Sequence, residues 1–403
     1  MPFRPYFFGF FAIVAVLLSG GTFASAQPTT DFSSWKDAKN ADAIPDRVQR
    51  MLLRDFRDFT GTDREELLAK TLSELADIAL DSDVVPSTRY NAVLAVGQLE
   101  SSSGSPPVAY PAALTVLVDV YQKTDSPAYM KYGALLGIVR HALCGIDPAR
   151  QDEVINLLLK TVTGEFDAGV AEPLEPAVED WFRLTALDGL AALKTTGPNG
   201  NIVEGLLAVI DQKSQELENL SRLDEILTRE NWKQSCRSIE LASKAAKTLG
   251  DFDYQSATDI DAKKMTDTFI RLPQSVCNVQ RKMAVIPTGR EETSPAPAML
   301  IEQIVHNVKF CTQSVIWGIR SGLLTSKPGE NSFYASLEDD DPAVKRLDIL
   351  LTEVIELTTF FDEGEKSRRT VAAANAPKEF KFNLSELRDA LAKCAETIAK
   401  EGD

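Results

Sequence analysis

The sequence predicts an all-α fold, and three observations support this prediction. Apolar residues recur about every 3.6 residues in nearly every periodic segment after residue 40, which is the period of an α-helix. No run of alternating Val, Ile and Thr bounded by turn residues requires a sheet. Hydrophobic residues make up 44% of the 403 residues and charged residues 25%, which excludes a disordered or collagen-like chain. The chain is therefore expected to be a globular protein built from helices.

The N-terminus has the features of an export signal. Arg4 supplies a positive charge before an apolar run from Tyr6 to Leu18. This run is shorter than the roughly 20 apolar residues that span a bilayer, which favours a cleaved signal over an anchor. We expect a signal peptide over residues 1–26 and an exported mature chain (periplasm, cell envelope or extracellular) that does not span a membrane. The expected cleavage site and first mature residue are Ala24, Ala26 and Gln27.

Helices are expected along the rest of the chain, each from its own apolar stripe or terminal signal. The first has Pro45 near its start, where the missing N–H does no harm. The second carries the stripe from Leu67 to Ile78. The last begins at Asn383, which caps the helix while Glu386 reaches back to it. Between these, the periodicity predicts helices near 110–122, 128–143, 150–163, 178–194, 201–218, 235–249, 298–322 and 342–361.

A repeated pattern joins several turns to the helix that follows. It consists of Asp, then Pro, then Arg or Lys six residues after the Asp, followed by small and apolar residues at helical spacing. Proline begins a helix without losing a useful hydrogen bond, and the Asp is expected to face the basic residue. Such a helix hairpin cannot bury both faces alone, so copies must stack. The members are Asp83, Pro86 and Arg89; Asp125, Pro127 and Lys131; Arg183, which lacks the Asp; and Asp339, Pro342 and Lys345.

This pattern resembles the inter-helix turn and second helix of the HEAT repeat. The likeness is good over 65–99 and 111–143 and weaker over 178–193, 201–249 and 339–355. The resemblance implies a curved solenoid of stacked antiparallel helix pairs that acts as a scaffold or binding surface and has no catalytic residues. An alternative interpretation makes the basic positions a ladder for an anionic ligand: Arg89, Lys131 and Arg183.

Prolines and charge suggest where the array is interrupted. The stretch 268–290 contains no acidic residue but several basic ones, and four prolines lie between residues 271 and 297. We therefore expect five segments: the signal peptide (1–26), an N-terminal extension (27–43), a helical repeat array (44–252), an irregular Pro-rich connecting segment (253–297) and a C-terminal helical unit (298–403).

Few residues are available for metal or redox chemistry. The five cysteines form no C-x-x-C pair, and their odd number leaves at least one free thiol. The sequence does not decide whether Cys277 forms a disulfide with one of the other cysteines. His141 and Cys144 share a helix face, but two ligands without acidic or Cys neighbours do not make a metal site. Since no catalytic or phosphate-binding motif occurs either, we expect no catalytic residue, cofactor or metal.

The charge and the architecture together suggest a binding protein. A net charge of −16 argues against a nucleic-acid partner, because such binding requires an excess of Lys and Arg. The expected function is an exported, non-enzymatic scaffold that binds a protein or a cell-envelope component. Two alternatives stay open: an enzyme of unrecognised type carried by the C-terminal helical unit, and a purely structural envelope protein.

Overall fold

The structure is a computed structural model, and it describes most of the chain after residue 60. The described residues are 61–102, 107–165, 174–223, 228–255, 257, 260–284, 297–321, 329–366 and 383–402. The predicted signal peptide, the N-terminal extension 27–43 and the helix expected near Pro45 lie outside them, as do the three cleavage-site positions Ala24, Ala26 and Gln27.

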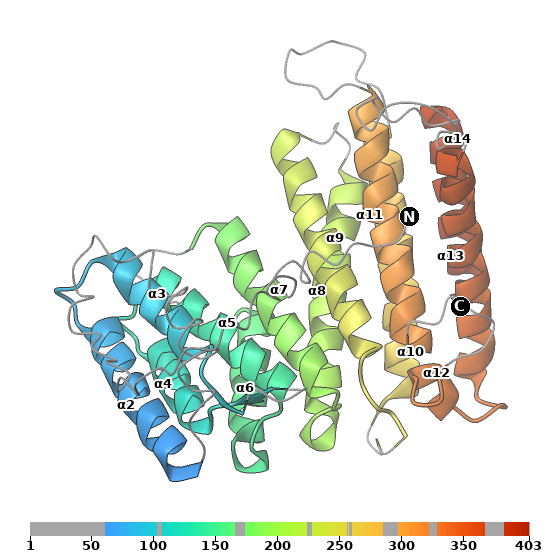
Figure 1. Ribbon diagram of the computed structural model, residues 1–403. Helices are drawn as coiled ribbons and strands as arrows, with labels where there is room; N and C mark the ends of the chain where they lie inside the picture. Colours follow the sequence, from blue (N-terminus) through green and yellow to red (C-terminus); the bar gives the residue numbers. More distant parts are fainter. Residues whose placement is uncertain are drawn as a thin grey trace, which may run out of the picture.

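The described residues confirm the all-α prediction, since about 81% of them are helical (Figure 1). The only strands among them are β1 (Glu100–Ser102) and β2 (Val108–Ala109), a short antiparallel pair that the sequence did not predict. No described helix is long and apolar enough to cross a membrane. The helices are α2 (Gly61–Leu80), α3 (Pro86–Val96), α4 (Pro111–Gln122), α5 (Ala128–Cys144), α6 (Pro148–Thr163), α7 (Pro176–Leu193), the 3-10 helix η4 (Pro198–Gly200), α8 (Asn201–Arg222), α9 (Arg229–Leu249), α10 (Ala262–Met283), α11 (Pro297–Arg320), α12 (Phe333–Ser336), α13 (Pro342–Lys366) and α14 (Leu384–Gly402).

Local sequence signals account for where several helices begin. Both Pro86 and Pro342 of the repeated pattern are the first residues of their helices, whereas Pro127 is the N-cap of α5. Proline suits these positions because its missing N–H would have no partner within the helix. The predicted cap of α14 is also confirmed: the Asn383 side chain accepts from the backbone N–H of Glu386 at 3.0 Å, and Glu386 Oε2 accepts from the Asn383 N–H at 2.9 Å.

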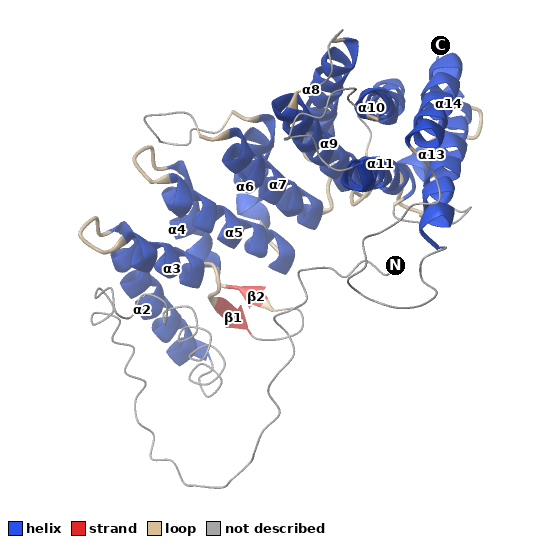
Figure 2. Cartoon of the chain, turned by 90° about the horizontal axis from the view of Figure 1, so that it is seen from above, coloured by secondary structure: helices blue, strands red, loops and turns tan. Residues whose placement is uncertain are grey.

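The helices pack in two successions that run side by side. Helices α3, α5, α7, α9, α11 and α13 each contact the next, and α6, α8, α10 and α14 do the same. Contacts also join α2 to α3, α4 to α5, α6 to α7, α8 to α9, α10 to α11 and α13 to α14. Viewed from above, the helices follow one another in a row from α2 to α14 (Figure 2). One continuous group of buried apolar side chains fills the space between the two successions.

The prediction of an irregular segment over 253–297 is wrong for residues 262–283, because these residues form helix α10. Pro273 lies inside this helix, where proline costs about 3 kcal/mol because it removes a hydrogen bond and crowds the preceding turn. Burial offsets this cost, because α10 contacts α8, α11 and α14 and buries large side chains along most of its length. These include Met265, Phe269, Leu272, Val276 and Val279. The segment that was predicted to interrupt the helix packing therefore contains a helix that packs against three others.

Glycines allow close helix contacts where a side chain would not fit. A Cβ at Gly97, the C-cap of α3, would lie 2.8 Å from the Cα of Gly137 of α5, and a Cβ at Gly318 of α11 would collide with the backbone oxygen of Ala246 of α9. The backbone cannot move aside as a flexible side chain can, so these contacts fix how near the helices approach.

We expect Gly318→Ala to lower the free energy of unfolding by about 1–2 kcal/mol, because the overpacking cost exceeds the helix-propensity gain of alanine. Urea denaturation measures the change. Gly205→Ala on α8 is the control, since the atoms nearest to its added methyl group belong to the flexible Leu159 side chain and not to a backbone. The Gly205 variant should be near neutral; equal losses at both glycines would contradict a backbone contact at Gly318.

Candidate functional site

Two basic residues of the repeated pattern bind the C-terminal end of the preceding helix. The Nε of Arg89 donates to the carbonyl oxygen of Ala79 at 3.0 Å, and the Nε of Arg183 donates to that of Val162 at 2.8 Å. Both carbonyls belong to the last turn of a helix, where backbone oxygens have no partner within the helix. Lys131, the third basic residue, is completely buried. This placement suits a structural role better than an exposed ladder for a ligand.

The predicted contact between Asp83 and Arg89 is wrong. Asp83 is exposed and its backbone N–H donates to Asp81, while the Arg89 guanidinium is directed to the helix end. A carboxylate in the turn keeps its hydration, whereas the orphan carbonyl of a helix end needs a donor, so the arginine satisfies the carbonyl. Asp125 is likewise exposed and pairs with Lys123 at 3.5 Å.

The fourth copy of the pattern differs from the others in its environment. Asp339 and Lys345 are both exposed. The next residue, Arg346, has the inward position instead, and its Nη1 donates to Asp267 Oδ1 at 2.6 Å. Proline begins the helix as in the first copy, but the basic residue that follows faces solvent.

Among the described residues, no hydrogen bond joins the side chains of His141 and Cys144. The His141 side chain is only 2% exposed, and its Nε2 has no hydrogen-bond partner among the described residues. Burial, and secondarily the charge of Arg140, lower the pKa of His141 to about 4, so the imidazole is neutral at pH 7. Cys144 is half-buried, and burial raises the pKa of its thiol. The described residues contain no group of three or more His, Cys, Asp or Glu side chains placed to hold a metal ion.

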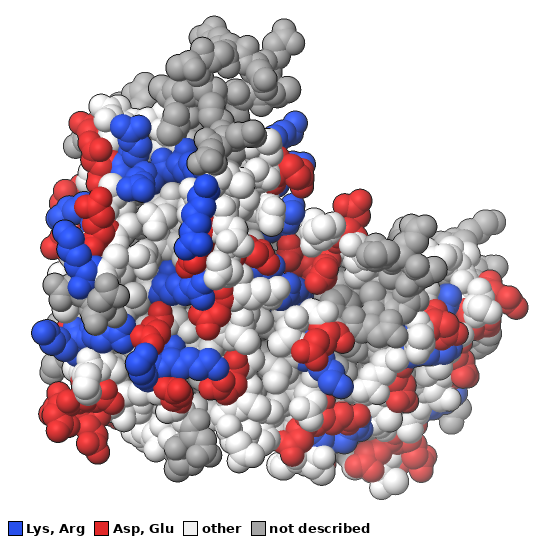
Figure 3. All heavy atoms as spheres, turned by 180° about the vertical axis from the view of Figure 1, so that it is seen from behind, with Lys and Arg blue, Asp and Glu red and all other residues white. Residues whose placement is uncertain are grey.

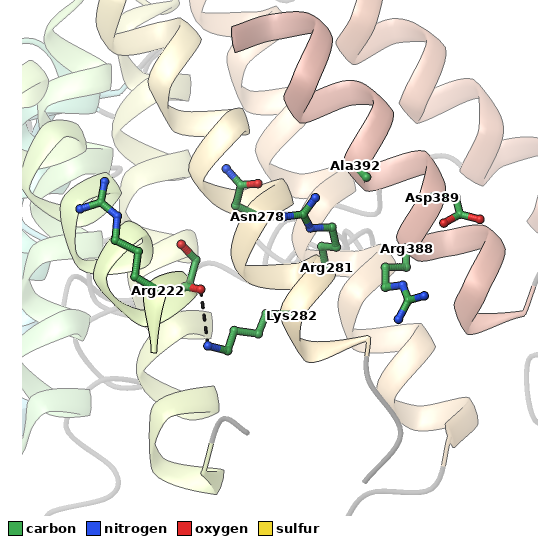
Figure 4. Close-up of a pocket in the computed structure, with 8 residues that line it drawn as sticks. Arg222, Asn278, Arg281, Lys282, Arg388, Asp389 and Ala392 are labelled. Carbon is green, nitrogen blue, oxygen red and sulfur yellow. Dashed lines mark hydrogen bonds between the residues drawn. The ribbon is translucent and has the colours of Figure 1, made fainter. Parts of the chain in front are cut away.

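A basic pocket of about 730 Å³ lies where α8, α10 and α14 meet. Figure 4 shows side chains from all three helices around one opening, with Lys282 extended toward α8. The Nζ of Lys282 lies 3.5 Å from the backbone oxygen of Ser221. The residues lining the pocket are Ser221, Arg222, Asn278, Arg281, Lys282, Arg388, Asp389 and Ala392. We call this hollow the basic pocket, because four of these side chains are cationic and one is acidic.

Most of the cations in the basic pocket lack a carboxylate partner. Arg222 lies 3.8 Å from Glu218, but Glu218 is mainly bound by Arg271, whose Nε donates to it at 2.7 Å. That hydrogen bond, more than any other interaction, lowers the pKa of Glu218. Within the described residues, no carboxylate lies within ion-pair distance of the three remaining cations, which are Arg281, Lys282 and Arg388.

A neighbouring hollow on α10 provides a contrast. It has a volume of about 370 Å³ and contains Arg271 and Arg346. Both arginines are paired, the first with Glu218 at 2.7 Å and the second with Asp267 at 2.6 Å. The hollow is therefore electrically balanced. The basic pocket differs because its positive charge is not balanced by the surrounding carboxylates.

Helix electrostatics explain only part of this charge. Arg222, Arg281 and Lys282 lie in the last turns of α8 and α10, where cations are favoured by the helix dipole. Arg388 lies near the beginning of α14, where the dipole gives a cation no such stabilisation. Seen from behind, Lys and Arg side chains also gather over the upper part of the C-terminal half of the molecule (Figure 3).

The arrangement can bind an anionic group. Cations from three helices line one hollow, and phosphate, sulfate and carboxylate oxygens are the acceptors that Arg and Lys bind in a charge-assisted way. One part of this signal is visible in the sequence, namely the acid-free stretch 268–290 with Arg281 and Lys282. The sequence did not associate Arg222 or Arg388 with that stretch, because both are remote in sequence. Comparisons with protein-family models, with curated proteins and with solved structures found no significant match.

Proposed function

We propose that the protein is an exported, non-enzymatic scaffold that binds an anionic protein or cell-envelope component through the basic pocket. The observation that carries the proposal is the set of three cations, Arg281, Lys282 and Arg388, that face one hollow without a described carboxylate partner. In a chain with a net charge of −16, such a local excess of positive charge marks a place where a negative group is attracted rather than repelled.

The proposed architecture is a HEAT-like solenoid of stacked helix pairs. Helix α3, which starts at Pro86, contacts α2, and α5, which is capped by Pro127, contacts α4; the glycine contact between α3 and α5 occurs where the repeats carry small residues. The hydrogen bonds from Arg89 and Arg183 to preceding helix ends support the same interpretation. A solenoid exposes a long surface on which a partner can lie, and the basic pocket would then anchor its anionic group.

Anion binding is tested with inorganic tripolyphosphate and the full mature chain 27–403, followed by calorimetry at low and moderate salt. We expect saturable binding that weakens as salt screens the charges. The variant Arg281→Glu/Lys282→Glu/Arg388→Glu should lose at least tenfold in affinity. Lys345→Glu is the matched control, since Lys345 is exposed but lies outside the pocket. Equal binding by both variants would contradict the proposal.

The macromolecular partner is identified by site-specific photocross-linking in the native compartment. A cross-linking amino acid at Asn278, which lines the basic pocket, should capture a partner that the same group at Lys345 does not capture. Charge reversal of Arg388 should reduce the yield at position 278. Identical products from both positions would show that the pocket is not the binding surface, and a captured nucleic acid would contradict the partner class.

A further inference from the structure

A smaller hollow lies in the N-terminal half of the chain, where the start of α4, the end of α5 and the start of α6 meet. Its volume is about 300 Å³, roughly that of ten water molecules. Apolar residues form most of its wall, namely Ala109, Pro111, Ala112, Leu114 and Ile146. The polar side chains that line it are Thr115, His141, Asp147 and Arg150. We call this hollow the His141 pocket.

The other three polar side chains of the His141 pocket have hydrogen-bond partners within the protein. Arg150 Nε donates to Glu153 Oε2 at 2.6 Å, and Arg150 Nη1 donates to Thr115 Oγ1 at 2.7 Å. Asp147 Oδ1 accepts from the backbone N–H of Ala149 at 2.9 Å and so caps α6. These groups are therefore held in place by the protein itself.

His141 is the exception among the polar residues of the pocket. It lines the hollow from the last turn of α5, yet the residue is only 2% exposed, so it forms part of the floor rather than the rim. Its Nε2 is buried and has no hydrogen-bond partner among the described residues. Buried polar atoms are rarely left unpaired in native proteins, because the hydration lost on burial must be replaced. This nitrogen therefore marks a position for a polar group of a ligand.

The charges around the His141 pocket favour an uncharged ligand. Glu153 pairs with Arg150, and Asp147 adds a second carboxylate beside this single cation. Burial, together with the charge of Arg140, lowers the pKa of His141, so the imidazole adds no positive charge at pH 7. The basic pocket has the opposite character, since its cations exceed its carboxylates. An anionic group is thus attracted to the basic pocket and not to this one.

We infer that the His141 pocket binds an aliphatic group that carries an amide, which is the chemistry of one apolar residue in a peptide or of a small free amide. The apolar wall accommodates the aliphatic part, and a mostly apolar hollow with few polar anchors is typical of small-ligand sites. An amide suits the anchor because the neutral imidazole has one donor and one acceptor nitrogen, and an amide can supply the matching group for either. The inference does not depend on the proposed function, because the two pockets share no residue.

The binding is tested with N-acetyl-leucinamide and the full mature chain 27–403, in which the histidine rings are labelled with carbon-13. The chain has only two histidines, so each ring gives its own NMR signal, and the variant His306→Gln assigns them. We expect a saturable shift of the His141 signal, with a dissociation constant of roughly 1 mM for so small a ligand. The signal of the exposed His306 should not move.

A second ligand tests the aliphatic part of the inference. N-acetylglycinamide has the same two amide groups but lacks the leucine side chain. It should bind more weakly by at least about tenfold, because it buries no aliphatic side chain in the pocket. Equal affinity for both amides would overturn the inference.

Matched variants place the binding in this pocket. Ala112→Trp fills the hollow from an exposed position of α4, so it should abolish binding while the protein stays folded. Ala208→Trp, at an exposed position of α8 that does not line the pocket, is the control and should bind as the wild type does. His141→Leu removes the polar anchor and should bind about tenfold more weakly, because the amide loses its partner. Saturation-transfer NMR on the ligand measures binding to all three variants.

The outcomes separate this inference from its alternatives. No saturable shift at His141, or equal binding by the wild type and Ala112→Trp, would overturn it. Should His141→Leu misfold, Ala112→Trp decides alone. Acetyl-Ala-Leu-Ala-amide distinguishes the source of the ligand: tighter binding than N-acetyl-leucinamide assigns the pocket to a peptide, and equal or weaker binding assigns it to a small free amide. A protein that binds the amide but ignores tripolyphosphate would defeat only the proposed function.

Discussion

Acidification from pH 7.5 to 4.5 is expected to destabilise the protein by roughly 2–3 kcal/mol through His141 alone. The pKa of this buried imidazole falls from 6.5 to about 4 on folding. Above pH 6.5 the imidazole is neutral in both states and the stability is unaffected. Between pH 6.5 and 4 only the unfolded chain binds the proton, so the stability falls as the pH falls.

The contribution of His141 is isolated by comparing variants, because carboxylates titrate in the same range. Urea denaturation at pH 7.5 and 4.5 should show a smaller loss for His141→Gln than for the wild type, by roughly 2–3 kcal/mol. His306→Gln, which removes the other, exposed imidazole, is the control and should keep the wild-type loss. The same pH dependence in all three proteins would show that His141 does not keep its buried, neutral state.

Replacement of Arg183 by alanine is expected to lower the free energy of unfolding by roughly 1.5–3 kcal/mol. Arg183 is 5% exposed, and the loss of its guanidinium leaves the carbonyl of Val162 without the donor that now lies 2.8 Å away. Burial lowers the pKa of Arg183, and Glu179 counteracts this from 3.9 Å, too far for a strong ion pair. The hydrogen bond to the helix end is therefore the main interaction that the variant loses.

Lys345→Ala is the matched control, because Lys345 has the same place in the repeated pattern but is exposed. Its effect should stay within about 0.5 kcal/mol. Denaturant midpoints of the two variants and the wild type measure the difference. Equal losses of unfolding free energy at both positions would contradict this expectation. They would mean that the contribution of the basic residue does not depend on its burial.

Local sequence was sufficient for the helices and many of their ends. Apolar spacing at 3.6 residues predicts helices because it places one stripe toward the core. Proline at a helix start and the reciprocal contacts of Asn383 and Glu386 depend only on neighbouring residues, and the structure confirms both. Pro273 was misleading for a related reason: the local cost of an interior proline is visible in the sequence, but the burial that offsets it is not.

The groups that pair with each charged side chain are set by the tertiary structure. Arg89 and Arg183 satisfy carbonyls of earlier helices, while the carboxylate expected beside Arg89 remains in water. Whether a cation is neutralised depends on which side chains from other helices reach it, as the pairing of Arg271 with Glu218 shows. Sequence proximity carries no such information.

The sequence by itself determined that this protein is helical, that its helices begin where local caps and prolines allow, and that one stretch is unusually rich in positive charge. Only the tertiary structure placed Arg222 and Arg388 beside Arg281 and Lys282. The physical reason is the range of the interactions. Helix periodicity and capping act within a few residues, whereas the basic pocket exists only because α8, α10 and α14 pack together.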